Sequence, residues 1–280
     1  MENQFETVLT ANPNTFRETC RQVKAYRDLI LLFVRRDFVL TYKQTVLGPI
    51  WLLIKPFMTS VVFAFIFGGI AGISTDGTPQ LLFYMAGNML WACFSTTLTG
   101  ASNTFITNSA IFSKVYFPRL TMPVAQMLIS IINFFIQCAM YLIMIVYYKL
   151  TGADIMFTKY AFLIPVVLVQ VSVLGLSIGI MVSSLTTKYR DLSIVVTFAL
   201  QLWMYLTPIV YPLSMTSGVM RACLLVNPMT MPVEIMRLGT LGQGTFNLPS
   251  FLGAIAFSVL FFAAGIRMFT KVERNFVDTI

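Results

Sequence analysis

Long stretches without charged residues divide the chain into apolar segments. An ionised side chain at the centre of a bilayer costs about 3 kcal/mol on insertion scales, and about 20 apolar residues cross the hydrocarbon core. A charge-free stretch of this length therefore predicts one membrane-spanning helix. The pattern predicts six spans, at residues 47–67, 81–98, 122–147, 161–185, 194–210 and 251–269.

The segment before the first span has a different pattern. Between residues 26 and 42, apolar side chains recur three to four residues apart, at Ile30, Phe33, Val34, Phe38 and Tyr42. Its apolar core, residues 29–34, is too short to cross a bilayer. We expect an amphipathic helix that lies in the membrane interface among anionic lipid headgroups. A soluble helix packed on a partner is the alternative.

Composition supports the membrane class. Hydrophobic residues make up 57% of the 280 residues and charged residues 11%, and the mean hydropathy is +0.80, whereas a soluble chain has about 25% charged residues. Histidine is absent, which excludes imidazole catalysis and histidine-bound metals. The four cysteines, Cys20, Cys93, Cys138 and Cys223, have no CxxC spacing. We therefore expect an all-α integral membrane protein without a metal site or a disulfide framework.

The net charge of +8 indicates orientation in a membrane chain rather than nucleic-acid binding. Residues 1–24 do not resemble a signal peptide, so we expect the amino terminus to stay inside. The inner segments then hold fourteen basic residues: Arg17, Arg21, Lys24, Arg27, Arg35, Arg36, Lys43, Lys114, Arg119, Lys188, Arg190, Arg267, Lys271 and Arg274. The outer loops hold four: Lys149, Lys159, Arg221 and Arg237. The positive-inside rule therefore predicts that both termini are cytoplasmic.

The inner connection at residues 100–119 is too long to be a plain turn. Its pattern predicts a short helix at residues 110–116, capped by Asn108 or Ser109 and ended by Pro118. The apolar side chains of this helix suit a cleft on a soluble partner, but most short loop helices pack on their own protein. They are Ile111, Phe112 and Val115.

The outer connection at residues 211–250 is apolar in its middle and is interrupted by prolines. It is too apolar for a free loop and too broken for a seventh span. We expect a helical pair that re-enters the membrane from outside. Glu234 and Arg237 are three residues apart, so they should pair on one helix face.

Lys55 and several aromatic residues are the candidates for contact with a substrate. Lys55 lies about 12 Å into the first predicted span, so it either snorkels to the interface or meets an anionic substrate in a hydrated interior. Most aromatic residues should face lipid or the interface. Six on the second and fifth spans are candidates for a channel wall, because ring faces stack on sugars: Tyr84, Trp91, Phe94, Trp203, Tyr205 and Tyr211.

The chain carries no energy-coupling motif of its own. No G-x-x-x-x-G-K-[ST] sequence occurs, and the predicted spans hold no acidic residue that could relay protons. If the chain moves a substrate uphill, the energy comes from elsewhere. This points to an ATPase on the cytoplasmic face.

Four segments, in this order, carry a resemblance to a known family. They are Arg36-Asp37 with Tyr42 and Leu47-Gly48-Pro49-Ile50-Trp51, then Lys114-Val115-Tyr116-Phe117-Pro118-Arg119, then Tyr189-Arg190-Asp191, and finally Thr207-Pro208-Ile209-Val210-Tyr211-Pro212 with Asn227-Pro228. Together they resemble the membrane subunit of ABC-2 type exporters, in the branch that moves O-antigens, capsules and teichoic acids. Residues before 26 match nothing in that family.

The resemblance implies a half-transporter in the bacterial inner membrane that forms a homodimer and binds two copies of an ABC ATPase. ATP and Mg would bind to that partner, and this chain would hold no cofactor. The helix at residues 26–42 would gate the cytoplasmic entrance for a lipid-linked glycan. The ATPase would receive the inner loop helix through Asn108, Ser109, Ile111, Phe112, Lys114 and Val115. The substrate phosphate would be steered by Arg35, Arg36, Lys43 or Lys55. The implied domains are residues 1–46 as cytoplasmic segment, 47–270 as transmembrane domain and 271–280 as tail.

Two other classes compete with glycan export. Drug exporters of the same architecture typically carry a larger outer domain between the first two spans, and here that loop is only residues 68–80. A membrane-embedded glycosyl- or acyltransferase would need acids, bases or a metal site at the interface. This chain has no histidine and only scattered carboxylates.

Overall fold

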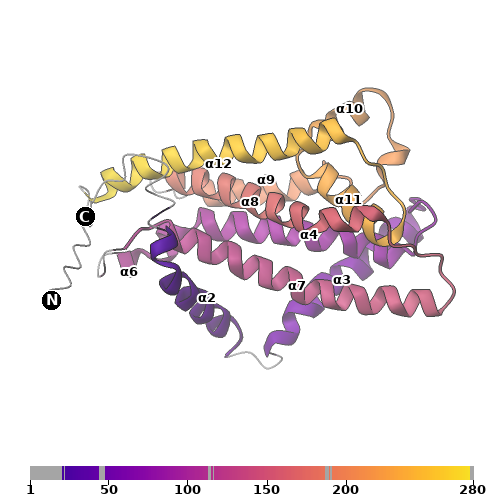
Figure 1. Cartoon of the computed structure of the whole chain (residues 1–280), viewed down its shortest axis with the longest axis horizontal. Coiled ribbons are helices and arrows are strands. Elements are labelled where there is room, and N and C mark those ends of the chain that lie inside the picture. The colour runs from indigo at the N-terminus through magenta and orange to yellow at the C-terminus, as the bar shows by residue number, and fades with distance from the viewer. Residues whose placement is uncertain are drawn as a thin grey trace, which may run out of the picture.

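The computed structural model describes residues 21, 23–43, 48–112, 115, 117–186, 189 and 191–277, which form a helical bundle without strands (Figure 1). The long helices are α2 (Arg27–Tyr42), α3 (Trp51–Phe63), α4 (Gln80–Ser102), α7 (Thr121–Leu150), α8 (Ile164–Thr186), α9 (Leu192–Tyr205) and α12 (Leu248–Val277). The shorter elements are η1 (Gly48–Ile50), η2 (Ala64–Ile70), α5 (Thr104–Thr107), α6 (Ser109–Phe112), η3 (Lys159–Leu163), η4 (Leu213–Met215), α10 (Gly218–Val226) and α11 (Thr230–Leu241).

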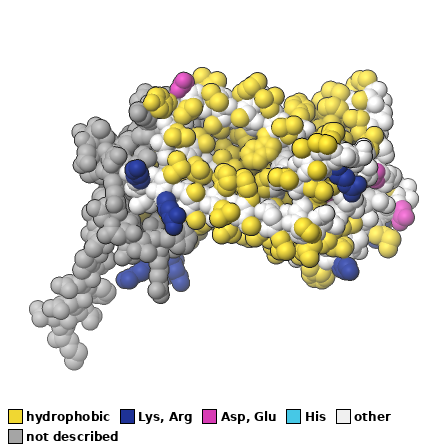
Figure 2. Space-filling view, turned by 90° about the horizontal axis from the view of Figure 1, so that it is seen from above, with side chains coloured by type: hydrophobic (Ala, Val, Ile, Leu, Met, Phe, Trp, Pro, Cys, Tyr) yellow, Lys and Arg dark blue, Asp and Glu magenta, His cyan; other side chains and the backbone are white. Residues whose placement is uncertain are grey.

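In Figure 1, α6 lies at one end of the bundle, beside the carboxyl end of α12, and α10 and α11 lie towards the opposite end. We call these the inner and outer ends, after the orientation that the charges predict. Figure 2 shows hydrophobic side chains across the middle of one face, with Lys and Arg towards the two ends. A chain that crosses a bilayer requires this distribution.

Five segments of the described chain are long and apolar enough to cross a membrane: Trp51–Ile70, Gln80–Ser102, Thr121–Leu150, Lys159–Thr186 and Leu248–Lys271. These five candidate spans coincide with five of the six predicted spans to within a few residues. In place of the remaining predicted span, the fifth in chain order at residues 194–210, the structure has the shorter helix α9 of 14 residues. At 1.5 Å per residue, α9 is about 21 Å long and does not cross a core of about 30 Å. It ends before Pro208, which has no N–H for the helical ladder and disfavours helix at Thr207.

Helix α4 lies at the centre of the bundle and packs on α7 and α8, and it is mostly buried, whereas α3 is mostly exposed. Close contact between α4 and α8 depends on Gly175 and Gly179. A Cβ at Gly175 would lie 2.8 Å from the Phe94 carbonyl oxygen, and one at Gly179 would lie 2.5 Å from Ala101 Cβ. Small residues allow this approach of helix backbones in membrane proteins.

Helix α2 has the predicted apolar stripe, but the chain itself covers it. Ile30, Phe33 and Val34 are buried against α7 and Phe117. The stripe therefore contacts its own chain, which neither the lipid interface nor a partner, the two predicted surroundings, describes. Other apolar side chains of α2, including Leu32 and Leu40, stay exposed. The side chain of Tyr42 lies outside the described residues.

The two long connections contain helices, as expected. The outer one forms the pair α10 and α11, and all but one of the residues of α11 are buried. The described part of the inner helix is α6, which overlaps the predicted range of 110–116, and the Val115 N–H donates to the Ile111 carbonyl oxygen at 3.1 Å. Residues 113, 114 and 116 lie outside the described part of the chain.

Candidate functional site

The residues predicted to dock the ATPase lie on and beside α6 at the inner end. Ile111 and Phe112 are half-buried against their own chain, whereas Val115 is 59% exposed. The Asn108 side chain donates to the Thr104 carbonyl oxygen at 3.1 Å, so it closes the preceding turn. Lys114 and the side chain of Ser109 lie outside the described residues. Among the predicted docking residues whose side chains the structure describes, Val115 is therefore the most exposed.

The basic residues predicted to steer a phosphate differ in their partners. Arg35 and Lys43 are exposed on α2. The neighbouring Arg36 donates from Nε to Asp37 Oδ1 at 2.6 Å and lies over the Phe33 ring. Lys55 is exposed on α3, with Nζ 6.0 Å from the centroid of the Trp51 ring. Arg35, Lys43 and Lys55 thus present charge at the surface, while Arg36 is paired.

The aromatic residues predicted for a channel wall fall into two groups. Tyr84, Trp91 and Phe94 on α4 are buried in the bundle. Trp203 on α9 covers two of them, with its ring centroid 6.4 Å from Trp91 and 5.1 Å from Phe94. Tyr205 is 55% exposed. The second group consists of Tyr205 and Tyr211 at the outer end of α9. In this conformation Tyr205 has the most exposed side chain of the six aromatic residues.

Tyr211 belongs to this second group. Its side chain is half-buried and its hydroxyl donates to the Tyr205 carbonyl oxygen at 3.3 Å. This hydrogen bond folds the segment after α9 back against the end of the helix.

A buried ion pair at the outer end is the feature that the sequence did not reveal in full. Glu234 and Arg237 lie on α11 with exposed fractions of 2% and 1%, and their charged atoms are 3.5 Å apart. The predicted pair is therefore confirmed, but it lies inside the protein rather than on an exposed helix face. An intramembrane charge that is fully enclosed is expensive unless hydrogen bonds satisfy it.

The partners of this pair come from three parts of the chain. Arg237 donates to the carbonyl oxygens of Pro208 at 2.6 Å and Ile209 at 2.7 Å, and its guanidinium lies 3.4 Å from the centroid of the Phe83 ring. Glu234 accepts from the Thr245 N–H at 2.8 Å. Arg237 thereby joins α11 to α4 and to the segment that follows α9.

Gly87 on α4 provides the space for this contact, since a Cβ there would lie 3.2 Å from Arg237 Nη2. The sequence could not have indicated this cluster by a local motif. Its members, Gly87, Thr207-Pro208 and Arg237, lie far apart along the chain.

Asn227 holds the end of α9 from the other side. Its Oδ1 accepts from Trp203 Nε1 at 3.2 Å and from the Met229 N–H at 3.0 Å. Its Nδ2 donates to the Leu206 carbonyl oxygen and to Thr207 Oγ1, each at 3.0 Å. The carbonyl oxygens of residues 206, 208 and 209, which have no place in the α9 ladder, are thus bound by Asn227 and Arg237. The end of α9 is fixed by the outer helical pair.

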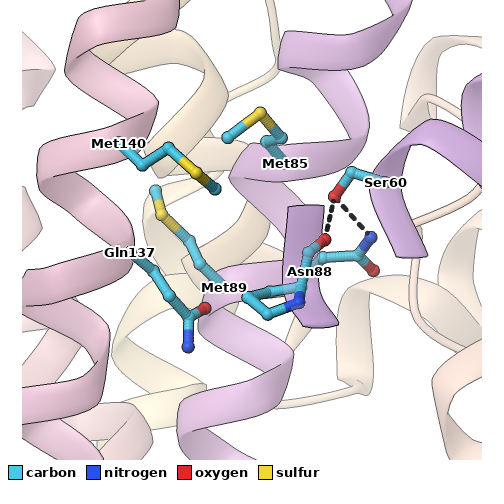
Figure 3. A pocket seen from close by; sticks show the side chains of 7 residues that line it. Ser60, Met85, Asn88, Met89, Gln137 and Met140 are labelled. Carbon is cyan, nitrogen blue, oxygen red and sulfur yellow. Dashed lines mark hydrogen bonds between the residues drawn. The ribbon is translucent and has the colours of Figure 1, made fainter. Parts of the chain in front are cut away.

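A small pocket, lined by three methionines, a proline and three polar side chains, lies between α3, α4 and α7 (Figure 3). Ser60 Oγ donates to the Pro56 carbonyl oxygen at 2.9 Å and accepts from Asn88 Nδ2 at 3.0 Å. Gln137 Oε1 is buried without a hydrogen-bond partner among the described residues, and three methionines complete the lining, at 85, 89 and 140. This polar contact joins the exposed helix α3 to the core.

The chain matches one family over most of its length. Residues 28–241 match the family described as ABC-2 type transporter. The chain is similar to an O-antigen export system permease protein RfbA of Klebsiella pneumoniae, with 23% identity over 90% of this chain and 95% of that protein. It is also similar to the protein of the same description from Myxococcus xanthus, with 25% identity over 93% of this chain and 98% of that protein.

Proposed function

The chain belongs to the ABC-2 type transporter family, and we propose that it is the membrane subunit of an ATP-driven exporter of a lipid-linked, O-antigen-like polysaccharide. The similarity to O-antigen export permeases over nearly the whole of both chains carries this proposal. The chain is a transport subunit, and the energy comes from a separate ABC ATPase. It acts in the bacterial inner membrane, with both termini in the cytoplasm.

The exporter is a homodimer with two ATPase copies. Two features of the described chain support a second copy. Helices α3 and α9 have one buried residue each and present apolar side chains along their length, among them Met58 and Val62 on α3 and Ile194 and Phe198 on α9. Such faces need a cover of lipid or of another helix. We propose that a part of them contacts the second copy and that the substrate path runs between the copies.

The fifth of the six proposed crossings is made by α9 together with the residues that follow it. The carbonyl groups freed where the helix ends are bound by Asn227 and Arg237. Irregular backbone is tolerated at membrane depth when protein covers it in this way. The helical pair α10 and α11 then re-enters from the outside, so the chain keeps six crossings.

The proposed path uses the exposed members of the basic set and the two aromatic residues at the outer end of α9. Arg35, Lys43 and Lys55 attract the phosphate of the lipid-linked glycan at the inner end, where charge-assisted contacts to phosphate are strong. Tyr205 and Tyr211 meet the glycan at the outer end through aromatic stacking. Tyr84, Trp91 and Phe94 reach the path only if α9 separates from α4, because Trp203 covers this face.

Deletion of the chain tests this function. We expect the surface glycan to disappear and the lipid-linked glycan to accumulate inside, and the tagged chain to co-purify with an ABC ATPase. An unchanged surface glycan in the deletion strain would refute glycan export. Loss of resistance to a small amphiphile with an unchanged glycan would instead favour a drug exporter of the same family.

A further inference from the structure

Five phenylalanines form a continuous series of ring contacts at the inner end, which we call the aromatic ladder: Phe33, Phe117, Phe112, Phe105 and Phe269. Successive ring centroids are 5.5, 5.5, 5.8 and 5.1 Å apart. The ladder starts on α2, passes through the segment before α7 and through α6 and α5, and ends on α12. All of its rings except that of Phe112 are almost fully buried.

Phe112 is the middle member and the only one on α6. The described part of this helix has four residues, and the Val115 N–H bonds the Ile111 carbonyl oxygen one turn on, so it is too short to be stable by backbone hydrogen bonds alone. Its position therefore depends on side-chain contacts, and Phe112 supplies two of the ring contacts. The Arg119 guanidinium lies 5.7 Å from the centroid of the Phe112 ring. The Phe112 side chain thus faces its own chain, while Val115 remains exposed to a partner.

We propose that Phe112 is a positioning residue that passes movement of α6 to α2 and α12. This inference rests on the proposed function and on the docking of the ATPase at α6, which the family resemblance implies. Packed aromatic rings resist compression, so α6 cannot shift without displacing Phe105 and Phe117. Phe105 stacks on Phe269 of α12, and Phe117 contacts Phe33 of α2. One displacement would therefore reach both the entrance helix and the last span.

The alternative assigns Phe112 to the ATPase contact itself, as the sequence pattern suggested. The two roles differ in what a loss of the ring would do. A docking residue contributes to affinity for the ATPase, whereas a positioning residue leaves the affinity intact and lowers the transport obtained from each ATP. Spatial proximity alone does not establish coupling, so the decision needs both readouts.

The test uses Phe112→Leu in the full complex of the chain with its ATPase. Leucine keeps apolar contact but loses the ring. The matched control is Phe257→Leu, because Phe257 stacks on Phe261 of α12 at 4.0 Å outside the ladder. We expect Phe112→Leu to retain the ATPase at the control level and to export about 2- to 30-fold less glycan per ATP hydrolysed, the range of coupling changes of about 0.5–2 kcal/mol. Phe112→Tyr keeps the ring and should restore the ratio.

A second readout follows the movement itself. Spin labels at the exposed Leu40 of α2 and Leu150 at the outer end of α7 report the distance between the entrance helix and the bundle. In the otherwise unchanged complex this distance should shift when ATP binds, and the shift should disappear in Phe112→Leu. A residue with a merely structural role would lower the protein level without changing the shift in the molecules that remain.

Each outcome decides between the roles. If Phe112→Leu exports the normal amount of glycan per ATP hydrolysed and shows the normal ATP-dependent change in label distance, the positioning role of Phe112 is refuted. Loss of the ATPase from Phe112→Leu would overturn it as well, in favour of docking. If this variant is not produced, Phe117→Leu serves the same purpose, since it breaks the ladder on the side of α2. Absence of an ATPase from the wild-type complex would refute the proposed function instead.

Discussion

Replacing Arg237 by methionine should destabilise the outer end of the protein more than any exposed substitution. Methionine fills a similar apolar length but donates no hydrogen bond. The change leaves the carbonyl oxygens of Pro208 and Ile209 without their donors at 2.6 and 2.7 Å, and it leaves the Glu234 carboxylate buried without its counter-ion.

The magnitude follows from the burial of the pair. Breaking one partner of a buried ion pair costs about 3–5 kcal/mol. Hydrogen bonds in membrane interiors are worth only about 0.6 kcal/mol each on average, so most of the loss comes from the unpaired carboxylate. Arg237→Lys keeps the charge but cannot reach two carbonyl oxygens with a planar fork, and we expect it to cost about 1–3 kcal/mol.

The free energy of unfolding can be measured by SDS titration of the purified chain in mixed micelles. The double variant Arg237→Met with Glu234→Gln removes both charges, so it should be less destabilised than the sum of the two single variants. Arg221→Met is the matched control, because Arg221 is exposed on α10. Equal stability of Arg237→Met and Arg221→Met, or strict additivity in the double variant, would refute the role assigned to the buried charge.

Four further predictions concern the surroundings of the path. Asn227→Ala should cost about 2 kcal/mol in the same titration through its lost hydrogen bonds; no loss would show that α9 ends without this support. Cys223 is exposed on α10, so a membrane-impermeant thiol reagent should label it from outside the cell and should not label Cys223→Ser; labelling only after permeabilisation would reverse the orientation. Val115→Asp should release the ATPase from the purified complex while the chain stays inserted, and unchanged co-purification would remove Val115 from the contact. Tyr205→Leu should lower surface glycan per subunit by about 5-fold if one stacking contact of about 1 kcal/mol is lost, and a normal glycan level would exclude Tyr205 from the path.

The positions of the spans could be predicted from the sequence because the cost of burying a charge in lipid is local. The cost depends on whether a residue is charged and not on which helices lie beside it. Charge-free stretches therefore predict spans without knowledge of the packing. The prediction for residues 122–147 differs from the observed Thr121–Leu150 by only a few residues. The length of the fifth span was overestimated. Its helix, α9, ends before Pro208 inside an apolar stretch, and the apolar pattern alone does not show this end.

The faces of the helices could not be predicted in the same way. In water, an apolar stripe marks the buried side of a helix, but in a bilayer both the core and the lipid accept apolar side chains. Helices α3 and α4 are both apolar, yet α3 is mostly exposed and α4 mostly buried. The stripe of α2 was assigned to lipid for the same reason, although Phe33 and Val34 contact α7.

Small and polar residues carry the information about faces that apolar residues lack. Gly87 and Asn88 on α4 lie where α4 meets Arg237 and Ser60, and a residue of either kind would gain nothing from lipid. The neighbouring Tyr84 and Trp91 therefore belong to a helix whose polar side chains already point into protein, which explains why they are packed rather than exposed. The exposed face of α9 presents the side chains of Ile194, Phe198 and Tyr205, whereas its inner side is held by the hydrogen bond from Trp203 Nε1 to Asn227 Oδ1. A substrate path that must open and close is better placed along a face without fixed hydrogen bonds, because its separation from a neighbour breaks none of them. This reasoning favours α9 over α4 as the wall of the path.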